Sequence, residues 1–223
     1  PATFSLLPWR PKTNAVARMF CDIVKPDGEP FEGDSRAVLR RNLKRAAKLG
    51  YTYYVAPEIE YFYFEDSQST KPLDDSGYFD QDPQDLATDL RRETVLTLEE
   101  LGIPVESSHH EVAPSQHEID LRYTDALTMA DTVMTYRQAV KEVAVRNGVY
   151  ASFMPKPITG VNGNGRGPVE LSVSGPRFSK RGQEFAFWGE FLDTIVTPVG
   201  DVDRAVSVYS DSPRHVELSV TSA

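Results

Sequence analysis

The chain has 223 residues, of which 40% are hydrophobic and 26% are charged, a composition typical of a globular protein with a core. Its 24 Lys and Arg against 33 Asp and Glu give a formal net charge of −9, and no basic run is present, which argues against nucleic acid and anionic membranes as partners. The single cysteine excludes an internal disulfide and favours a reducing, cytoplasmic compartment.

No apolar run approaches the ~18 residues of a membrane-spanning helix, so no membrane segment is expected. The chain starts at Pro1, without Met and without the pattern of a signal peptide, which indicates an internal part of a longer chain. Residues 1–33 alternate short apolar stretches with Pro and Gly, and therefore predict short strands and loops.

Three helices carry boundary signals. The first is expected to begin at Asp34 or Ser35 and to end before Gly50. The second has Asp82 as its cap and Pro83 at its first helical position. The third is expected over residues about 125–146. The predicted apolar faces of the second and third helices are Leu86, Leu90, Leu98 and Leu101, and Leu127, Ala130, Met134 and Val140.

Runs of aromatic and β-branched residues predict strands at residues 51–55, 58–64, 105–110, 116–121 and 150–154. Pro57 separates the first two, and the polar residues 65–77 predict a surface loop. Strands, hairpins and helices joined by long connections favour an α+β fold, in which helices cover a mixed or antiparallel sheet.

Two glutamates lie two positions apart on one predicted strand. Because strand side chains alternate, Glu58 and Glu60 share a face with Phe62 and Phe64. These acids either point into water from a half-exposed strand, or they lie beside an apolar surface where their charges need partners.

A second acidic pair flanks Pro114 and Ser115. If these two residues form the turn of a hairpin, Glu111 lies directly across from Glu118, and a divalent cation would relieve the repulsion. The alternative is a longer loop with the acids in solvent. His109 and His110 are adjacent and so point to opposite faces, which argues against a compact zinc triad; glutamates without thiolate favour Mg²⁺ or Mn²⁺.

Three segments, taken together, resemble type I glutamine synthetases in their order and in their amino-acid sequence. They read PEIEYF at residues 57–62, HHEVAPSQHE at 109–118, and MPKP with GVNG at 154–163. The resemblance implies the glutamine synthetase catalytic-domain fold and ATP-dependent ligation of ammonia to glutamate through γ-glutamyl phosphate. It also implies a cytoplasmic homo-oligomer, which is a dodecamer in the family.

The resemblance implies two or more Mg²⁺ or Mn²⁺ ions at each site, with ATP as co-substrate. One ion would be held by Glu60, Glu111 and Glu118, and Glu58 would help to hold a second. Paired carboxylates and two metals suit phosphoryl transfer, which needs positioning and charge neutralisation more than a protein nucleophile. No catalytic side chain is assigned. The other matched positions are nucleotide contacts at Glu106, Tyr123 and Tyr78, and glutamate contacts at Asn162 and Gly163.

Residues 166–223 do not align with the family. Gly167 stands where the family has a metal-binding His, and the Arg motifs that clamp phosphate are absent. We therefore divide the chain into residues 1–165, a portion of a glutamine synthetase-like catalytic domain, and residues 166–223, a β-rich tail or the continuation of that domain. A partial or chimeric sequence is favoured over a degenerate natural relative or a distinct module.

The main expectation is a glutamate–ammonia ligase whose parent protein is active, although this chain alone is expected to be a poor catalyst. A non-catalytic metal- or nucleotide-binding subunit with a regulatory or assembly role is the alternative. A γ-glutamyl ligase that uses another amine is a further one. A glycosidase, the usual reading of paired carboxylates, is disfavoured.

Overall fold

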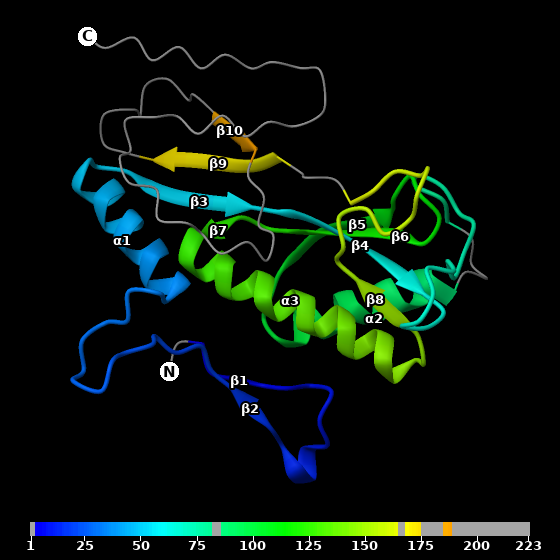
Figure 1. Ribbon diagram of the computed structural model, residues 1–223, viewed down its shortest axis with the longest axis horizontal. Helices are drawn as coiled ribbons and strands as arrows, with labels where there is room; N and C mark the ends of the chain where they lie inside the picture. Colours follow the sequence, from blue (N-terminus) through cyan, green and yellow to red (C-terminus); the bar gives the residue numbers. More distant parts are fainter. Residues whose placement is uncertain (1–2, 82–85, 165–167, 175–184, 189–223) are drawn as a thin grey trace.

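The computed structural model describes residues 3–81, 86–164, 168–174 and 185–188 (Figure 1). The expected helix start at Asp82 and Pro83, and Gly167 with most of the tail, lie outside the described residues. The elements are, in chain order, β1 (Ser5–Leu6), η1 (Lys12–Asn14), β2 (Ala17–Arg18), α1 (Ser35–Lys48), β3 (Thr52–Ala56), β4 (Glu58–Phe64), α2 (Leu86–Glu100), β5 (Val105–His110), β6 (Gln116–Leu121), β7 (Thr124–Asp125), α3 (Ala126–Arg146), β8 (Tyr150–Ser152), β9 (Pro168–Ser174) and β10 (Phe185–Trp188).

The described strands form two four-stranded sheets and one two-stranded ribbon. The first sheet has the order β10-β9-β3-β7, the second has the order β5-β6-β4-β8, and the ribbon pairs β1 with β2. All of these pairings are antiparallel. The combination of antiparallel sheets with long helices confirms the expected α+β fold.

Pro57 marks the passage of the chain from one sheet to the other. β3 and β4 follow one another and are separated only by this residue, which cannot donate a hydrogen bond to a strand ladder. β3 pairs with β7 along one edge and with β9 along the other. The pairing with β9 runs from Thr52 opposite Ser174 to Ala56 opposite Glu170. Residues beyond 165 therefore contribute a strand to this sheet, while the division of the chain at residue 165 remains a prediction.

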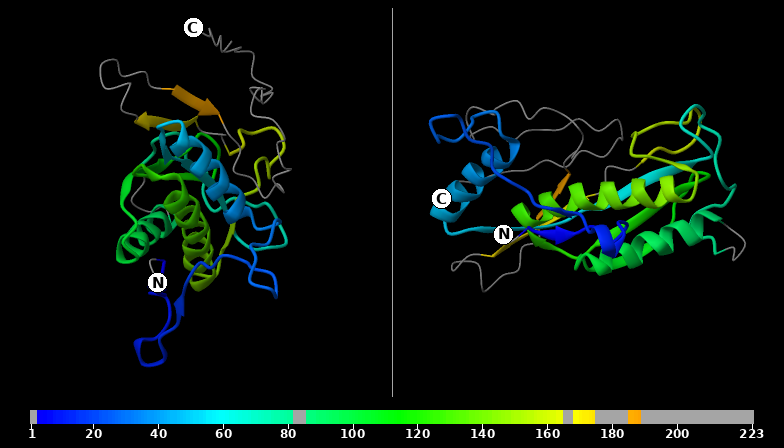
Figure 2. Two further views of the ribbon diagram at one scale, coloured as in Figure 1. Left: turned by 90° about the vertical axis from the view of Figure 1, so that its left-hand side faces the viewer. Right: turned by 90° about the horizontal axis from the view of Figure 1, so that it is seen from below.

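The two long helices α2 and α3 lie side by side and cover one face of the β5-β6-β4-β8 sheet (Figure 2). Because side chains alternate along β4, only every second residue of this strand faces the two helices. Tyr61 and Tyr63 are fully buried against the helices, whereas Phe62 and Phe64 form a smaller cluster on the other face. The expected division of the β4 side chains between two faces is confirmed. No helix in the described part of the chain is long and apolar enough to cross a membrane.

The helix boundaries follow the capping signals. The Asp34 carboxylate accepts a hydrogen bond from the N–H of Arg36 at 3.0 Å, and Gly50 follows the helix with φ of 85°. Asp125 caps α3 in the same way, because its carboxylate accepts from the N–H of Thr128 at 3.1 Å.

The expected apolar faces of α2 and α3 are partly wrong. Leu86 is 52% exposed and Met134 is 53% exposed. In α2 the buried face instead runs through Ala87, Leu90 and Thr94 to Leu98, so that a small residue and a threonine complete the helical stripe. Thr94 can be buried because its hydroxyl donates to the carbonyl of Leu90 at 2.9 Å.

This burial pattern gives a stability test on α2. Leu98 is fully buried in the main core, so Leu98→Ala should lower the free energy of unfolding by about 2–5 kcal/mol. Leu96→Ala removes the same atoms from a side chain that is 56% exposed, and should have little effect. Urea denaturation followed by circular dichroism measures both. Equal losses for the two variants would contradict the placement of this helix.

Candidate functional site

Two glutamates face each other across the β4–β6 pair. The register places Glu60 opposite Glu118 and Glu58 opposite Asp120. Side chains that are directly opposite on antiparallel strands have Cβ atoms about 5 Å apart, so two like charges in these positions oppose pairing unless a cation compensates them. The sheet therefore gathers carboxylates on the face that the helices leave uncovered.

The expected pairing of Glu111 with Glu118 across the β5–β6 hairpin is wrong. Glu118 lies opposite His109, and the N–H of Glu111 donates to the carbonyl of Gln116 at 2.7 Å. β5 ends at His110 and β6 begins at Gln116, so five residues, 111–115, connect the strands rather than two. Within this connection the N–H of Gln116 bonds to the carbonyl of Ala113 at 3.0 Å, and Ser115 adopts φ of 57°. The resulting shift of two residues preserves the strand face, so Glu111 stays on the side of Glu118.

His109 lies between these two acids. Its Nε2 atom is 2.8 Å from Glu111 Oε1 and 3.4 Å from Glu118 Oε2. The three side chains are 12%, 13% and 7% exposed in the order His109, Glu111, Glu118. Within the described part of the chain, these three form a group whose ligand-type atoms all lie within 4.8 Å of one another; Glu60 is not in that group.

Burial and neighbouring acids disfavour the charged form of Glu118. Burial is the largest cause that raises the pKa of its carboxyl, and Asp120, Glu111 and Glu60 raise it further. Charge of the opposite sign would reverse this shift. Carboxylate oxygens are the ligands that Mg²⁺ and Mn²⁺ prefer, and the crowding of acids around Glu118 fits a divalent cation.

Three ligand-type side chains also gather on the opposite face of the hairpin. His110 and His117 lie side by side, with ring centroids 4.6 Å apart, and both contact Asp74. The adjacent His109 and His110 thus point to opposite faces, as expected, but the pairing of His110 with His117 was missed. Asp74 also corrects the prediction of a surface loop at residues 65–77, because its side chain is only 7% exposed.

Tyr78 lies beside the acidic group. Its ring meets that of His109 edge-on, with centroids 5.6 Å apart, and the neighbouring Phe79 stacks on His109 at 4.5 Å. Glu106 and Tyr123 lie away from the hairpin turn, near the start of β5 and just after the end of β6. Glu106 is exposed at a β-bulge, and Tyr123 is 67% exposed.

The loop that contains Asn162 and Gly163 is tied to the acids by a residue that sequence reasoning missed. The side-chain amide of Gln116 donates both to the Glu60 carboxylate and, at 2.9 Å, to the carbonyl of Gly163. A Cβ atom at Gly163 would collide with the carbonyl of Pro155, so the close approach of the two loop ends requires glycine. Asn162 is exposed.

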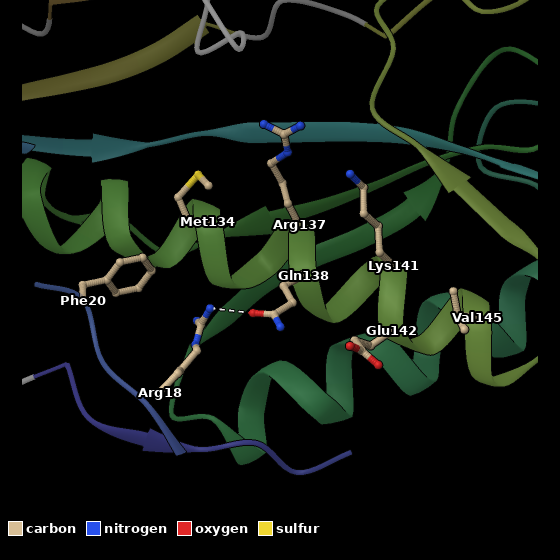
Figure 3. Close-up of a pocket in the computed structure, with 8 residues that line it drawn as sticks. All are labelled: Arg18, Phe20, Met134, Arg137, Gln138, Lys141, Glu142 and Val145. Atoms are coloured by element: carbon tan, nitrogen blue, oxygen red, sulfur yellow. Dashed lines mark hydrogen bonds between the residues drawn. The ribbon is translucent and has the colours of Figure 1, made fainter. Parts of the chain in front are cut away.

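A separate open pocket of about 640 Å³ lies between α3 and the N-terminal segment (Figure 3). Arg18 crosses it, donating to the Gln138 side-chain oxygen at 2.8 Å. None of the expected site residues lines it. The lining residues are Arg18, Phe20, Met134, Arg137, Gln138, Lys141, Glu142 and Val145.

Comparison with known proteins points to one family. The family profile described as the catalytic domain of glutamine synthetase matches residues 32–174, so the expectation that the family match stops at residue 165 is wrong. A glutamine synthetase of Clostridium saccharobutylicum is 53% identical over 167 residues, which are 73% of this chain and 38% of that protein. One of Staphylococcus epidermidis is 47% identical over 212 residues, covering 93% of this chain and 44% of that protein.

Solved structures agree with this result. A structure described as apo GmaS superposes with a TM-score of 0.70 at 31% identity, over 82% of this chain and 42% of that one. The glutamine synthetase of Plasmodium falciparum gives a TM-score of 0.67 at 26% identity, over 78% of this chain and 39% of that one. The chain therefore spans about two fifths of the length of these relatives.

The environment of Glu118 predicts how pH acts on the metal-free chain. Its folded pKa lies above the ordinary 4.5, so ionisation of this group in the unfolded chain favours unfolding progressively as pH rises above about 4.5. Glu118→Gln removes this effect, and the variant should gain melting temperature over the parent as pH increases from 4.5 to 8. Thermal melts in EDTA measure the difference. A difference that stays constant or reverses over this range would contradict the buried, acid-crowded position.

Proposed function

Because this chain belongs to the glutamine synthetase family, we propose that it supplies the acidic side of a site that ligates ammonia to glutamate with consumption of ATP. A γ-carboxylate oxygen of glutamate attacks the γ-phosphorus of ATP, and the bond to the β-phosphate oxygen breaks as ADP leaves. Ammonia then attacks the γ-carbonyl carbon of the acyl phosphate, loses a proton, and displaces phosphate. The products are glutamine, ADP and phosphate.

Two Mg²⁺ or Mn²⁺ ions would supply charge neutralisation and phosphate orientation in this reaction. We assign Glu60, Glu111 and Glu118 to one ion and Glu58 to the second. The cross-strand position of Glu60 opposite Glu118 supports the assignment, as does the closeness of Glu111 to Glu118 around His109. His109 shares this group and is placed to orient the Glu111 carboxylate by its 2.8 Å contact.

We assign the nucleotide to Tyr78, Glu106 and Tyr123, and the substrate glutamate to the loop of Asn162 and Gly163. A relative described as a GmaS/ADP complex, 29% identical with a TM-score of 0.68, supports a nucleotide site in this fold. The Gln116 amide, which contacts both Glu60 and the carbonyl of Gly163, would couple the metal centre to the glutamate loop.

The proposed setting is a cytoplasmic homo-oligomer, a dodecamer as the family resemblance implies. The observation that supports the functional proposal is the position of Glu60 opposite Glu118, with Glu111 close to Glu118, on the sheet face opposite the helices in a chain of this family. In this proposal, other parts of the whole protein contribute cationic groups that stabilise the transferred phosphate.

The proposal is tested on the whole protein by following glutamine formation from glutamate, ammonia and ATP. Activity should require Mg²⁺ or Mn²⁺, be lost in EDTA, and fall at least 100-fold in Glu111→Ala, because one carboxylate ligand is removed. Glu65→Ala is the matched control, since Glu65 pairs with Lys71 on an exposed loop and should retain activity. Full activity in Glu111→Ala, or in EDTA, would refute the proposed function.

A further inference from the structure

A buried polar network lies behind the acidic group, on the other face of the β5–β6 hairpin. Its centre is Asp74, whose Oδ1 atom accepts from the N–H of Ser115 at 2.8 Å and lies 2.9 Å from Nε2 of His110. Burial alone would raise the pKa of Asp74, but contacts with His110, His117 and the Ser115 amide hold it well below its ordinary range. Asp74 is therefore a carboxylate that is fixed inside the protein.

The Ser115 side chain also forms hydrogen bonds with the segment that carries Asp74. Its Oγ atom accepts from the backbone N–H groups of Leu73 and Asp74, at 2.6 and 2.9 Å. The residue is fully buried and holds φ of 57°, a backbone conformation that L-residues other than Asn and Asp rarely adopt. Reciprocal bonds between Asp74 and Ser115 thus clamp the turn that sets the register of the hairpin.

The second histidine joins the network from the side of α2. A guanidinium nitrogen of Arg91 lies 2.6 Å from Nδ1 of His117, and since a guanidinium can only donate, Nδ1 is the acceptor. The proton of the neutral ring is then on Nε2, which faces Oδ2 of Asp74 at 3.4 Å. Burial lowers the pKa of His117 to about 4, which keeps the ring neutral near pH 7.

The network ends at the backbone of the acidic group. His110 and His117 directly precede Glu111 and Glu118, so strand alternation turns the histidines to one face of the sheet and the glutamates to the opposite face. The His110 ring also contacts the carbonyl of Glu111 through Nδ1 at 2.6 Å. A displacement of either ring would therefore move the backbone that carries a glutamate of the acidic group.

We propose that Asp74 is a positioning residue for the metal centre. By holding the hairpin turn and both histidine rings, it fixes Glu111 and Glu118 at the spacing that one divalent ion requires. The inference rests on the proposed function for the metal itself, but the clamp on the hairpin is a property of the metal-free chain. Groups that orient the ligands of a metal typically change its affinity 10–100-fold when they are removed.

The test compares Asp74→Asn with Asp75→Asn, which makes the same charge change one residue along at an exposed position. Asp74→Asn should weaken Mn²⁺ binding at least 10-fold by electron paramagnetic resonance titration. It should also speed amide hydrogen exchange in residues 105–121 of the metal-free chain. Asp75→Asn should stay within twofold of the parent in both. A folded Asp74→Asn chain with both values within twofold of the parent would overturn the proposal.

Ser115→Ala decides the matter if Asp74→Asn does not fold, because it removes two accepted hydrogen bonds and leaves the buried charge in place. Faster exchange in the hairpin and weaker Mn²⁺ binding support the clamp, and unchanged values refute it. If the parent chain binds no Mn²⁺, the proposed metal site fails. The amide hydrogen exchange of residues 105–121 then still tests the clamp on the hairpin. Equal exchange in the parent and in Asp74→Asn would refute it.

Discussion

The antiparallel pairing of β4 with β6 is the constraint on which the rest of the site depends. It places Ile59 opposite Ile119 and Glu60 opposite Glu118, so that alternate pairs face opposite sides of one sheet. Ile119 is fully buried in the main core, and the same ladder fixes Glu118 on the opposite face of the sheet. A slip of one residue would send the acids into the core, so the apolar face enforces the geometry of the acidic one.

Contacts of β4 with α3 and among the buried tyrosines hold this register. The Tyr136 hydroxyl on α3 donates to the carbonyl of Ile59 at 2.9 Å, which fixes the helix against the start of β4. Tyr61 packs its ring against Tyr136 and Tyr63, with centroids 6.2 and 5.1 Å away. The acidic face opposes folding when no cation is bound, because Glu118 is desolvated among other acids. The apolar face must compensate for that cost, and we infer that metal binding and hairpin stability are coupled.

Much of the fold was predictable because its signals are local. The strands at Glu58–Phe64, Val105–His110 and Gln116–Leu121 have the expected bounds, since alternation and flanking turn residues mark them. Asp34 caps α1 as the sequence indicates, and α3 spans Ala126–Arg146, close to the expected bounds. These features depend on residues within one turn or one strand of each other, which is the range over which residue patterns carry information.

The errors arose where a distant contact decides the outcome. The hairpin register depends on the left-handed backbone of Ser115, which the buried carboxylate of Asp74 stabilises from 41 positions away. A single Asp in a polar loop gives no sign that it will be buried. The expected face of α2 was partly wrong because tertiary packing buries Ala87 and Thr94, residues that hydrophobic periodicity does not weigh. The register places Glu60 and Glu118 on one face of the sheet, and it shows His109 rather than Glu111 opposite Glu118 on β5; the metal assignment of these acids remains a prediction.

The most direct test of this account is the position of bound Mn²⁺ in a crystal of the protein, located by anomalous scattering. We expect a peak on the face that carries the acidic group, with oxygen ligands from Glu111 and Glu118 at about 2.0–2.3 Å. Both histidines of the buried network should remain beside Asp74. A peak among Asp74, His110 and His117, or no peak near Glu118 at saturating Mn²⁺, would contradict the assignment of the metal centre to the acidic face.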